Sequence, residues 1–381
     1  MRKGERFLKN WFLDFNFFKS IDLFFIQLTL ALTVLGLIFA FLSSTYESNR
    51  LTNSFWSLGL KQLIAFILGF ILLLLFQKLH YKFWYKTTWL IAFTVLFIML
   101  VTVFSPLGKV SGGSQRWIDL GIIQFQPAEI AKFTVILLLT RFLTKYKWFE
   151  FKSYYYLIFI FGLILIILKQ PDLGSATILF LLFMELSFLF GWPLWILFLF
   201  SLLTGLIGYL KIYNTPYQLE RIQYWQDPYL DPQGKGYNLI QAMYALALGN
   251  FWGVGLGNSI QKQGHLPIPH SDFIFAVIAE EVGFLGVSAI LILFITWILR
   301  GLYLVNKVEN KYGKMLGSAI IFLIGTQATV NIAVAVGLLP VTGVTLPFFS
   351  CGGTSLIVTL AMCGILFNII STANLEATNN K

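Results

Sequence analysis

The sequence predicts an all-α, polytopic integral membrane protein, and its composition is the first reason. Of the 381 residues, 57% are hydrophobic and only 12% are charged, and the mean hydropathy is +0.78. A soluble domain carries about 25% charged residues, because it needs a wetted polar surface. The composition therefore excludes a water-soluble enzyme, a DNA-binding protein and a secreted disulfide scaffold.

Ten long apolar runs are the second reason. A bilayer core about 30 Å thick requires roughly 20 apolar residues per helix. Runs of this kind lie at residues 23–43, 60–77, 88–105, 127–143, 155–169, 174–190, 193–210, 272–299, 315–337 and 352–372. No small-residue cleavage site follows the first run, so we expect it to be retained as a helix. The runs predict about ten transmembrane helices in a single transmembrane domain over residues 1–381.

The basic residues predict the orientation of these helices. With the N-terminus inside, 17 of the 27 Lys and Arg residues fall in inner segments and nine in outer segments. Lysine and arginine collect in cytoplasmic loops of membrane proteins. We therefore expect both termini in the cytoplasm and a large extracytoplasmic loop, about residues 211–271, between helices 7 and 8.

The outer segments are long and varied, whereas the inner loops are short, basic and without a nucleotide-binding motif. The fragment GVGLG at 253–257 lacks the strand–helix context of a dinucleotide fingerprint. The two cysteines, Cys351 and Cys363, form no disulfide framework, and no CxxC motif or histidine cluster suggests a metal site. Any chemistry is therefore expected on the outer side, without ATP supplied from the inside.

Several ionisable residues lie at membrane depth, where they are costly and usually functional. Glu129 and Lys132 are three residues apart and so are neighbours on one helix face. They form either a self-neutralising pair or a substrate contact, and the sequence leaves both open. Asp172 is more consistent with capping the sixth helix. Glu185 either pairs with another helix or lines a water-filled cavity.

The eighth apolar run begins with a cluster of acids in HSDFIFAVIAEEVGFLG, namely Asp272, Glu280 and Glu281. In a helix, Asp272 and Glu280 are about 12 Å apart along the axis. Two carboxyls that act on one glycosidic bond are about 6.5–9.5 Å apart or closer, so these two cannot easily share one bond. Asp272 therefore stands alone, either as a base toward a hydroxyl at the outer leaflet or as a helix N-cap.

Five ordered blocks of the chain resemble the SEDS family of cell-wall polymerases (FtsW/RodA/SpoVE). The blocks are GGSQRWIDLGIIQFQPAEIAKF (112–133), QPDLGSATI (170–178), RIQYWQDPYLDPQGKGYNLIQAMYAL (221–246), GVGLGNSIQKQGHLPIPHSDFIFAVIAEEVGFLG (253–286) and GLLPVTGVTLPFFSCGGTSL (337–356). Residues 225–228 and 255–262 are more similar to the division branch, FtsW, than to the elongation branch, RodA. The blocks cover the outer face and most helices from the fourth to the tenth.

The resemblance implies a peptidoglycan glycosyltransferase that polymerises lipid II on the outer face of the cytoplasmic membrane during cell division. Asp272 matches the family's catalytic aspartate and would act as base on the acceptor hydroxyl, and undecaprenyl pyrophosphate would leave. The expected substrate-binding residues are Arg116, Glu129, Lys132, Arg221 and Glu280. Arg116 is the first choice for the pyrophosphate, and Glu129 is expected to hold Lys132 in place.

The resemblance also implies a partner, a class B penicillin-binding protein that supplies transpeptidation, together with other divisome proteins. No cofactor is evident, although a divalent cation (Mg²⁺ or Mn²⁺) bound to the substrate pyrophosphate would leave little trace in the sequence. An elongation polymerase, a lipid II flippase and an inactive septal scaffold remain alternatives. The membrane is either that of a bacterium or the inner membrane of a peptidoglycan-bearing plastid.

Three departures from the family pattern bear on the site. Ala128 stands where the family usually has Ser, which should be mild. The acidic residue that usually precedes His270 is missing, so that a local carboxylate is lost. Cys351 stands where the family favours Tyr; if that Tyr contacts substrate, Cys351 cannot copy its hydrogen bond well.

Overall fold

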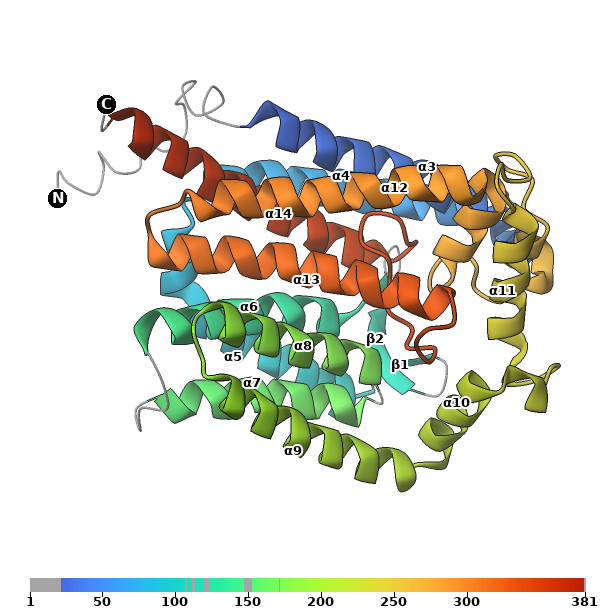
Figure 1. Ribbon diagram of the computed structural model, residues 1–381, viewed down its shortest axis with the longest axis horizontal. Coiled ribbons are helices and arrows are strands. Elements are labelled where there is room, and N and C mark those ends of the chain that lie inside the picture. Colours follow the sequence, from blue (N-terminus) through green and yellow to red (C-terminus); the bar gives the residue numbers. More distant parts are fainter. Residues whose placement is uncertain are drawn as a thin grey trace.

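The computed structural model describes residues 22–106, 108–111, 114–119, 124–146, 153–170 and 172–379. Its long helices run in one common direction, and short helices cross one end of the bundle (Figure 1). Within the described residues, ten helices lie on the ten apolar runs. They are α3 (Leu23–Thr52), α4 (Ser57–Lys78), α5 (Lys82–Phe104), α6 (Pro127–Lys145), α7 (Tyr154–Lys169), α8 (Leu173–Leu189), α9 (Leu194–Tyr213), α12 (Ile274–Asn306), α13 (Lys311–Ala335) and α14 (Gly353–Asn379).

The helices have the lengths and composition of membrane spans. Six of those in the described ranges, α3, α4, α5, α12, α13 and α14, are long and apolar enough to cross a membrane, and α7, α8 and residues 194–210 of α9 are shorter apolar helices. The prediction of an all-α polytopic membrane protein is confirmed. The orientation, with both termini in the cytoplasm, stays a prediction.

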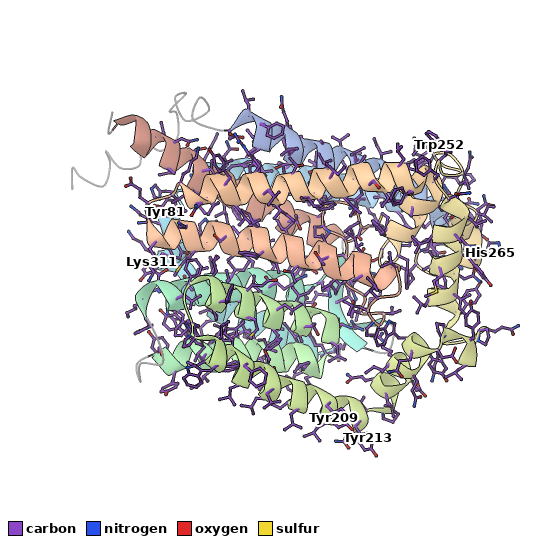
Figure 2. The ribbon with its side chains drawn as sticks, in the orientation of Figure 1. Tyr81, Tyr209, Tyr213, Trp252, His265 and Lys311 are labelled. Atoms are coloured by element: carbon purple, nitrogen blue, oxygen red, sulfur yellow. The ribbon has the colours of Figure 1, made fainter. Side chains whose placement is uncertain are left out.

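The two ends of the bundle carry different residues. Figure 2 places Tyr81 and Lys311 at one end, and Trp252 and His265 at the other. Tyr209 and Tyr213 lie at the far end of α9, which is peripheral and has mostly exposed side chains. Aromatic side chains of this kind gather where a membrane meets water, so these positions mark an interfacial level.

Helix ends in the bundle are fixed by short polar side chains. Asp172 accepts a hydrogen bond from the Ser175 backbone N–H at 3.0 Å and so caps α8, as the sequence favoured. Asp22 caps α3 in the same way and also pairs with Arg300 of α12. Each cap satisfies a backbone donor that the helix itself leaves unpaired.

The segment 211–271 is not the plain loop that the sequence suggested. It contains α10 (Pro216–Gln226), the 3₁₀ turn η2 (Pro228–Leu230), α11 (Tyr237–Gly249) and the π-helical turn η3 (Gln261–His265). Helices α10 and α11 cross one end of the bundle (Figure 1). The segment therefore forms an ordered layer of short helices across this end of the bundle.

A small sheet, which the sequence did not predict, lies at the same end between α5 and α6. Strands β1 (Gly108–Ser111), β2 (Ser114–Asp119) and β3 (Gln124–Phe125) pair antiparallel in that order. The Thr354 hydroxyl of α14 donates to the Gln124 carbonyl at 3.0 Å and accepts from the Gln126 backbone N–H at 3.2 Å. The sheet is thereby attached to the start of α14.

Helix α12 is interrupted near its N-terminal end. Gly283 has φ +66°, a conformation that favours glycine, and a Cβ there would lie 2.3 Å from the Gly253 backbone nitrogen. The carbonyls of Glu280 and Glu281 accept from the backbone N–H groups of Val254 and Gly255 at 2.9 and 3.0 Å. The segment after α11 thus replaces the hydrogen bonds that the break removes from α12.

The segment between α13 and α14, residues 337–352, enters the bundle as irregular backbone. We call it the α13–α14 loop. It presses against α3 so closely that a Cβ at Gly36 would lie 2.1 Å from the Phe348 carbonyl oxygen. Phe348 and Phe349 are almost completely buried. The glycine is therefore required by the loop's approach and not by its own helix.

Replacing Gly36 with alanine should destabilise the protein by about 1–3 kcal/mol, the usual cost of forcing extra atoms into a packed core. Gly205 of α9 is the matched control, because a Cβ there meets nothing within 4 Å. Gly205→Ala should stabilise its helix by about 0.5–1 kcal/mol. Thermal unfolding in detergent measures both changes. A Gly36→Ala variant that melts at the wild-type temperature would contradict the close packing of the loop.

Candidate functional site

Asp272 lies just before α12 and does not cap it. The N-cap position of α12 is Phe273, and no side chain makes a capping hydrogen bond there. The Asp272 carboxylate instead accepts from the Ser271 hydroxyl at 3.0 Å. The N-cap interpretation of Asp272 is therefore wrong, and its carboxylate remains able to accept further hydrogen bonds.

The charges around Asp272 come from three distant parts of the chain. Arg116 of β2 and Arg221 of α10 both act on the carboxylate electrostatically and lower its pKa, while Asp172 at the start of α8 raises it. The largest effect is burial, which raises the pKa of Asp272 above its ordinary value. The fold thus places a partly buried carboxylate within electrostatic range of two arginines and of Asp172.

The α13–α14 loop forms one wall of this site. Gly343 has φ +72°, and a Cβ there would lie 3.6 Å from Asp272 Oδ2. A residue with a side chain would therefore be strained at this position and would also crowd the carboxylate. The backbone of the loop faces Asp272 directly.

Helix α10 anchors the first half of the α13–α14 loop. The Arg221 guanidinium donates to the Val341 carbonyl at 3.2 Å, and the Trp225 indole N–H donates to the Gly337 carbonyl at 2.9 Å. Arg221 therefore has two roles, since it also contributes positive charge at Asp272.

Helix α13 and the residue before Asp272 anchor the second half of the loop. The Asn331 amide donates both to the Val344 carbonyl at 2.7 Å and to the Asp272 carbonyl at 3.0 Å. The Ser350 hydroxyl donates to the Ser271 carbonyl at 2.7 Å. These bonds fix the backbone of Asp272 against the loop, so loop and carboxylate form one unit.

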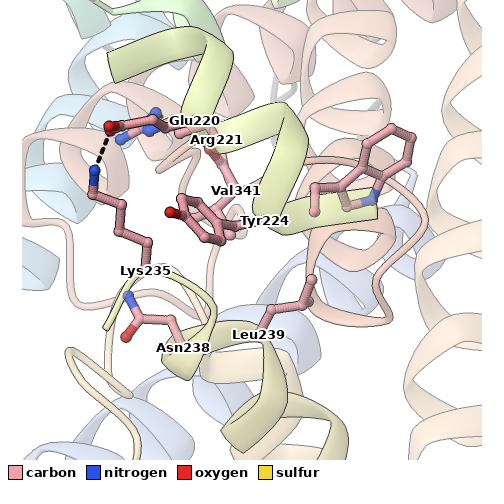
Figure 3. A pocket seen from close by; sticks show the side chains of 8 residues that line it. Glu220, Arg221, Tyr224, Lys235, Asn238, Leu239 and Val341 are labelled. Atoms are coloured by element: carbon pink, nitrogen blue, oxygen red, sulfur yellow. Dashed lines mark hydrogen bonds and ion pairs between the residues drawn. The ribbon is translucent and has the colours of Figure 1, made fainter. Parts of the chain in front are cut away.

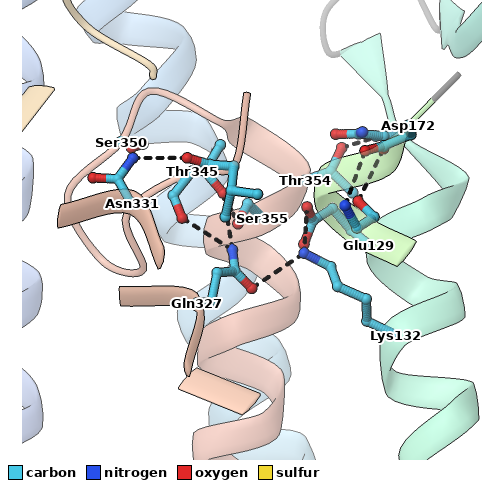
Figure 4. Close-up of polar contacts among 12 residues, drawn as sticks. Glu129, Lys132, Asp172, Gln327, Asn331, Thr345, Ser350, Thr354 and Ser355 are labelled. Atoms are coloured by element: carbon cyan, nitrogen blue, oxygen red, sulfur yellow. Dashed lines mark hydrogen bonds and ion pairs between the residues drawn. The ribbon is translucent and has the colours of Figure 1, made fainter. Parts of the chain in front are cut away.

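The Glu129–Lys132 pair belongs to the same network (Figure 4). The Lys132 ammonium, 2% exposed, lies 2.8 Å from a Glu129 oxygen and donates to Gln327 Oε1 at 3.1 Å. The Gln327 amide donates to the Thr345 carbonyl and hydroxyl, and the Thr345 hydroxyl also bonds to Ser355. The two charges neutralise each other, which was one of the two interpretations of the sequence. Through Gln327, the pair also connects α6 to the α13–α14 loop beside Asp272. Its contact with substrate stays a prediction.

Glu280 requires a correction, because the structure gives it no access to a substrate. Its side chain is completely buried, and its carboxylate accepts from the Ser259 hydroxyl at 2.5 Å and from the Ile260 backbone N–H at 2.8 Å. The Gln261 backbone N–H is also within hydrogen-bond range. Glu280 therefore holds the segment after α11 in place. Sequence spacing could not reveal this, because its partners are about 20 residues away.

The other two unusual residues also have partners in the structure. The Thr326 hydroxyl of α13 donates to Glu185 at 2.7 Å, so Glu185 bonds to another helix. The Cys351 thiol donates to the Ala40 carbonyl of α3 at 3.3 Å. Cys351 therefore contributes a bond to the bundle rather than a tyrosine-like donor to the site.

Two amides on α13, Gln327 and Asn331, were missed by sequence reasoning although they organise the site. They lie four residues apart on one helix face in an otherwise apolar run. Polar side chains facing a bundle interior are the signal that could have identified them.

A cavity of about 190 Å³ adjoins Arg221 under the short helices, as Figure 3 shows. Glu220, Arg221, Tyr224 and Trp225 of α10 line one side, and Lys235 pairs with Glu220 across its mouth. Among the residues that the structure describes, no group of three or more His, Cys, Asp or Glu side chains could hold a metal ion.

The fold and the site together define a polytopic membrane protein in which the Asp272 carboxylate, at one end of the helical bundle, lies in the field of two arginines. The chain belongs to the cell cycle protein family of FtsW, RodA and SpoVE, whose model matches residues 22–375.

Relatives in this family match along nearly their whole length. Stage V sporulation protein E of Bacillus subtilis is 34% identical over 356 residues, covering 92% of this chain and 97% of the relative. A probable peptidoglycan glycosyltransferase FtsW of Coxiella burnetii is 36% identical over 359 residues, covering 92% and 96%.

Solved structures share the architecture. A chain from a peptidoglycan synthase complex, described as coordinating polymerization and crosslinking, superposes with a TM-score of 0.76 at 30% identity, covering 93% of this chain and 98% of that one. The rod shape determining protein RodA of Thermus thermophilus gives a TM-score of 0.66 at 25% identity, covering 92% and 96%.

Breaking the buried pair between Lys262 and Glu281 tests how the segment after α11 is held. The two charges lie 2.7 Å apart, with side chains 6% and 0% exposed. Lys262→Met should cost about 3–5 kcal/mol, because it leaves Glu281 buried without its partner, and adding Glu281→Leu should recover most of that loss.

Lys235→Met is the matched control for this experiment, because the Lys235–Glu220 pair is exposed and water screens it. It should leave the melting temperature near the wild-type value. If Lys262→Met were as mild as Lys235→Met, the buried pair would not hold the segment.

Proposed function

We propose that this chain is a peptidoglycan glycosyltransferase that polymerises lipid II at the outer face of the cytoplasmic membrane during cell division. The observation that carries the proposal is Asp272, a partly buried carboxylate just before α12 with Arg116 and Arg221 acting on it electrostatically. The enzyme class is supported by relatives named probable peptidoglycan glycosyltransferase that match over more than nine-tenths of this chain.

In the proposed reaction, Asp272 takes the proton from the 4-hydroxyl of the acceptor N-acetylglucosamine. The oxygen attacks C1 of the donor N-acetylmuramic acid, and a β-1,4 bond forms as the bond to undecaprenyl pyrophosphate breaks. A general base contributes about 10²–10⁴-fold to rate. The rest of the acceleration must come from positioning and from charge stabilisation at the leaving group.

The leaving pyrophosphate gains negative charge as the bond breaks, and the proposed site supplies cations for it. Guanidinium groups bind phosphate oxygens with paired hydrogen bonds, which suits Arg116 and Arg221. Lys132 was also expected to contact the substrate, but it is buried and paired with Glu129 at 2.8 Å, so the pair adds no net charge for the pyrophosphate. A divalent cation, if one takes part, would be held by the pyrophosphate oxygens, since the described residues offer no cluster of three metal ligands.

Cross-linking of the glycan strands is proposed to occur in trans, through a class B penicillin-binding protein and other divisome proteins. This is supported by the likeness to a chain of a synthase complex that coordinates polymerization and crosslinking. The likeness to RodA keeps an elongation role as the alternative. Division and elongation polymerases would share the same chemistry and differ in their partners.

Asp272→Asn should lower lipid II polymerisation by about 10²–10⁴-fold, because the amide cannot accept the acceptor proton. The purified variant and the wild type are compared by the rate of glycan formation from labelled lipid II. Asp227→Asn is the control, because Asp227 is an exposed cap of η2 and asparagine caps equally well. Wild-type rates with Asp272→Asn would overturn the role of the base. Transport of lipid II across vesicles without glycan formation would replace the polymerase by a flippase.

A plot of kcat/KM against pH should fall on its acidic side, and this fall should occur at higher pH when the charge of Arg116 is removed. Asp272 must be ionised to act as a base, so kcat/KM falls as the pH drops through its pKa, which burial has already raised. Arg116 lowers that pKa; Arg116→Gln should therefore raise it and shift the fall to higher pH. Arg50→Gln is the control, because Arg50 is exposed and pairs with Glu47. An unshifted fall in Arg116→Gln would show that Arg116 does not act on the base.

A further inference from the structure

Four cations lie at the end of the bundle that carries Tyr81, whereas the layer of short helices covers the other end (Figures 1 and 2). Lys82 and Lys86 belong to the first two turns of α5. Arg141 and Lys145 belong to the last two turns of α6. Arg141 bonds to the residue that precedes Lys86, so the two helices bring their charges together. The proposed glycan chemistry uses none of these four side chains.

The four cations have no counter-charge. Within the described residues, none of them forms an ion pair with a carboxylate. The first turn of α5 has no acidic residue, and its N-cap side chain makes no capping hydrogen bond. Cations at the start of a helix oppose the helix dipole, whose positive end lies there. An excess of positive charge therefore remains at this end of α5, and an anion would offset it.

Arg141 is the best oriented of the four cations. Its guanidinium lies 4.4 Å from the centroid of the Tyr85 ring, and its Nη1 donates to the Tyr85 carbonyl at 2.5 Å. It also acts electrostatically on Tyr156 of α7, so it is close to three helices. A guanidinium has five N–H donors, and Arg141 uses one of them within the described part of the chain. Because the side chain is only partly buried, its orientation is fixed while part of the guanidinium stays open to a ligand.

Aromatic side chains place these cations at the level of lipid headgroups. The ring of Trp89 on α5 lies 5.4 Å from that of Tyr155 on α7. The Tyr155 and Tyr146 hydroxyls lie 3.3 Å apart, and Lys145 Nζ lies 5.2 Å from the centroid of the Tyr146 ring. Tryptophan and tyrosine concentrate where a membrane meets water. The cations are therefore at the depth at which a membrane presents its phosphates.

The surface next to this level suits acyl chains. Leu90, Phe93 and Phe97 of α5 are more than half exposed, and so is Ile158 of α7. A lipid whose phosphate is at Arg141 would have its acyl chains along these side chains. A soluble anion would make no use of them, so the position of the charges favours a lipid.

We infer that Arg141, with Lys86 and Lys145, binds the phosphodiester headgroup of an anionic phospholipid in the membrane leaflet at this end of the bundle. The guanidinium donates paired hydrogen bonds to the phosphate oxygens, and the two exposed lysines add charge. Basic surfaces between transmembrane helices recognise acidic headgroups in this way. The inference goes beyond the proposed function and does not rest on it, because it concerns a structural lipid and not the lipid-linked substrate.

Native mass spectrometry of the full chain, titrated with phosphatidylglycerol in detergent, measures the binding. Arg141→Gln should weaken the apparent affinity by about tenfold or more, because it removes the charged hydrogen bonds to the phosphate. Arg141→Lys should give a smaller loss, since the charge remains and the paired geometry does not. Lys311→Gln is the matched control, because Lys311 is an exposed lysine at the same end of the bundle (Figure 2). It should leave the affinity at the wild-type value.

A second variant keeps the test independent of folding, since Arg141 also bonds to α5. Lys86→Gln/Lys145→Gln changes two exposed side chains and should weaken binding by about fivefold for each charge removed. Thermal unfolding supplies a second readout. Phosphatidylglycerol should raise the unfolding temperature of the wild type above its value in phosphatidylcholine. This rise, measured for each variant against its own value in phosphatidylcholine, should shrink in the Arg141 and lysine variants and persist in Lys311→Gln.

Four outcomes would overturn the inference. Wild-type affinity in both Arg141→Gln and the double lysine variant would show that these side chains do not bind the lipid. An equal loss in Lys311→Gln would show a response to total charge and not to a site. Equal binding of phosphatidylcholine would remove the need for an anionic headgroup. Inorganic phosphate that raises the unfolding temperature as much as phosphatidylglycerol would identify a site for a soluble anion.

Discussion

Irregular backbone inside an apolar bundle is the constraint on which the site depends. Such backbone has peptide groups that no helix satisfies, and the bilayer offers no water to replace the missing bonds. In the α13–α14 loop, Arg221, Trp225 and Asn331 donate to backbone carbonyls that no helix pairs. The Asn331 amide also donates to the backbone carbonyl of Asp272. The same side chain therefore satisfies a loop carbonyl and positions the residue that carries the carboxylate.

The same constraint explains the buried acids after Asp272. Helix α12 breaks at Gly283, and the segment after α11 supplies N–H groups to the carbonyls that the break exposes. Glu280 then accepts from the N–H groups of that segment. Its neighbour Glu281 pairs with Lys262. Glu280, which the sequence suggested as a substrate ligand, therefore supports a broken helix together with Glu281.

Particular residues show where sequence reasoning succeeded. The ten apolar runs each coincide with a helix within the described ranges, because burial of apolar surface in a membrane needs continuous apolar length. Asp172 caps α8 as favoured, since capping depends only on residues three positions away. The family blocks indicated the class of protein, and Glu129 and Lys132 pair at the predicted helical spacing. Short polar strands such as β2 carried no comparable pattern.

What the sequence by itself determined is local: which segments are helices, where some of them begin, and which charged residues lie at the ends of the apolar runs or within them. Only the tertiary structure decided which charges meet. It brings Arg116, Arg221 and Asp172 within electrostatic range of Asp272, although Arg116 precedes Asp272 by 156 residues in the sequence. It also places the buried Glu280 away from the site. The physical reason is the distance along the chain over which each kind of interaction acts. Helix periodicity and capping act over three or four residues, whereas the charge around a carboxylate depends on distances through space that only the packed bundle sets.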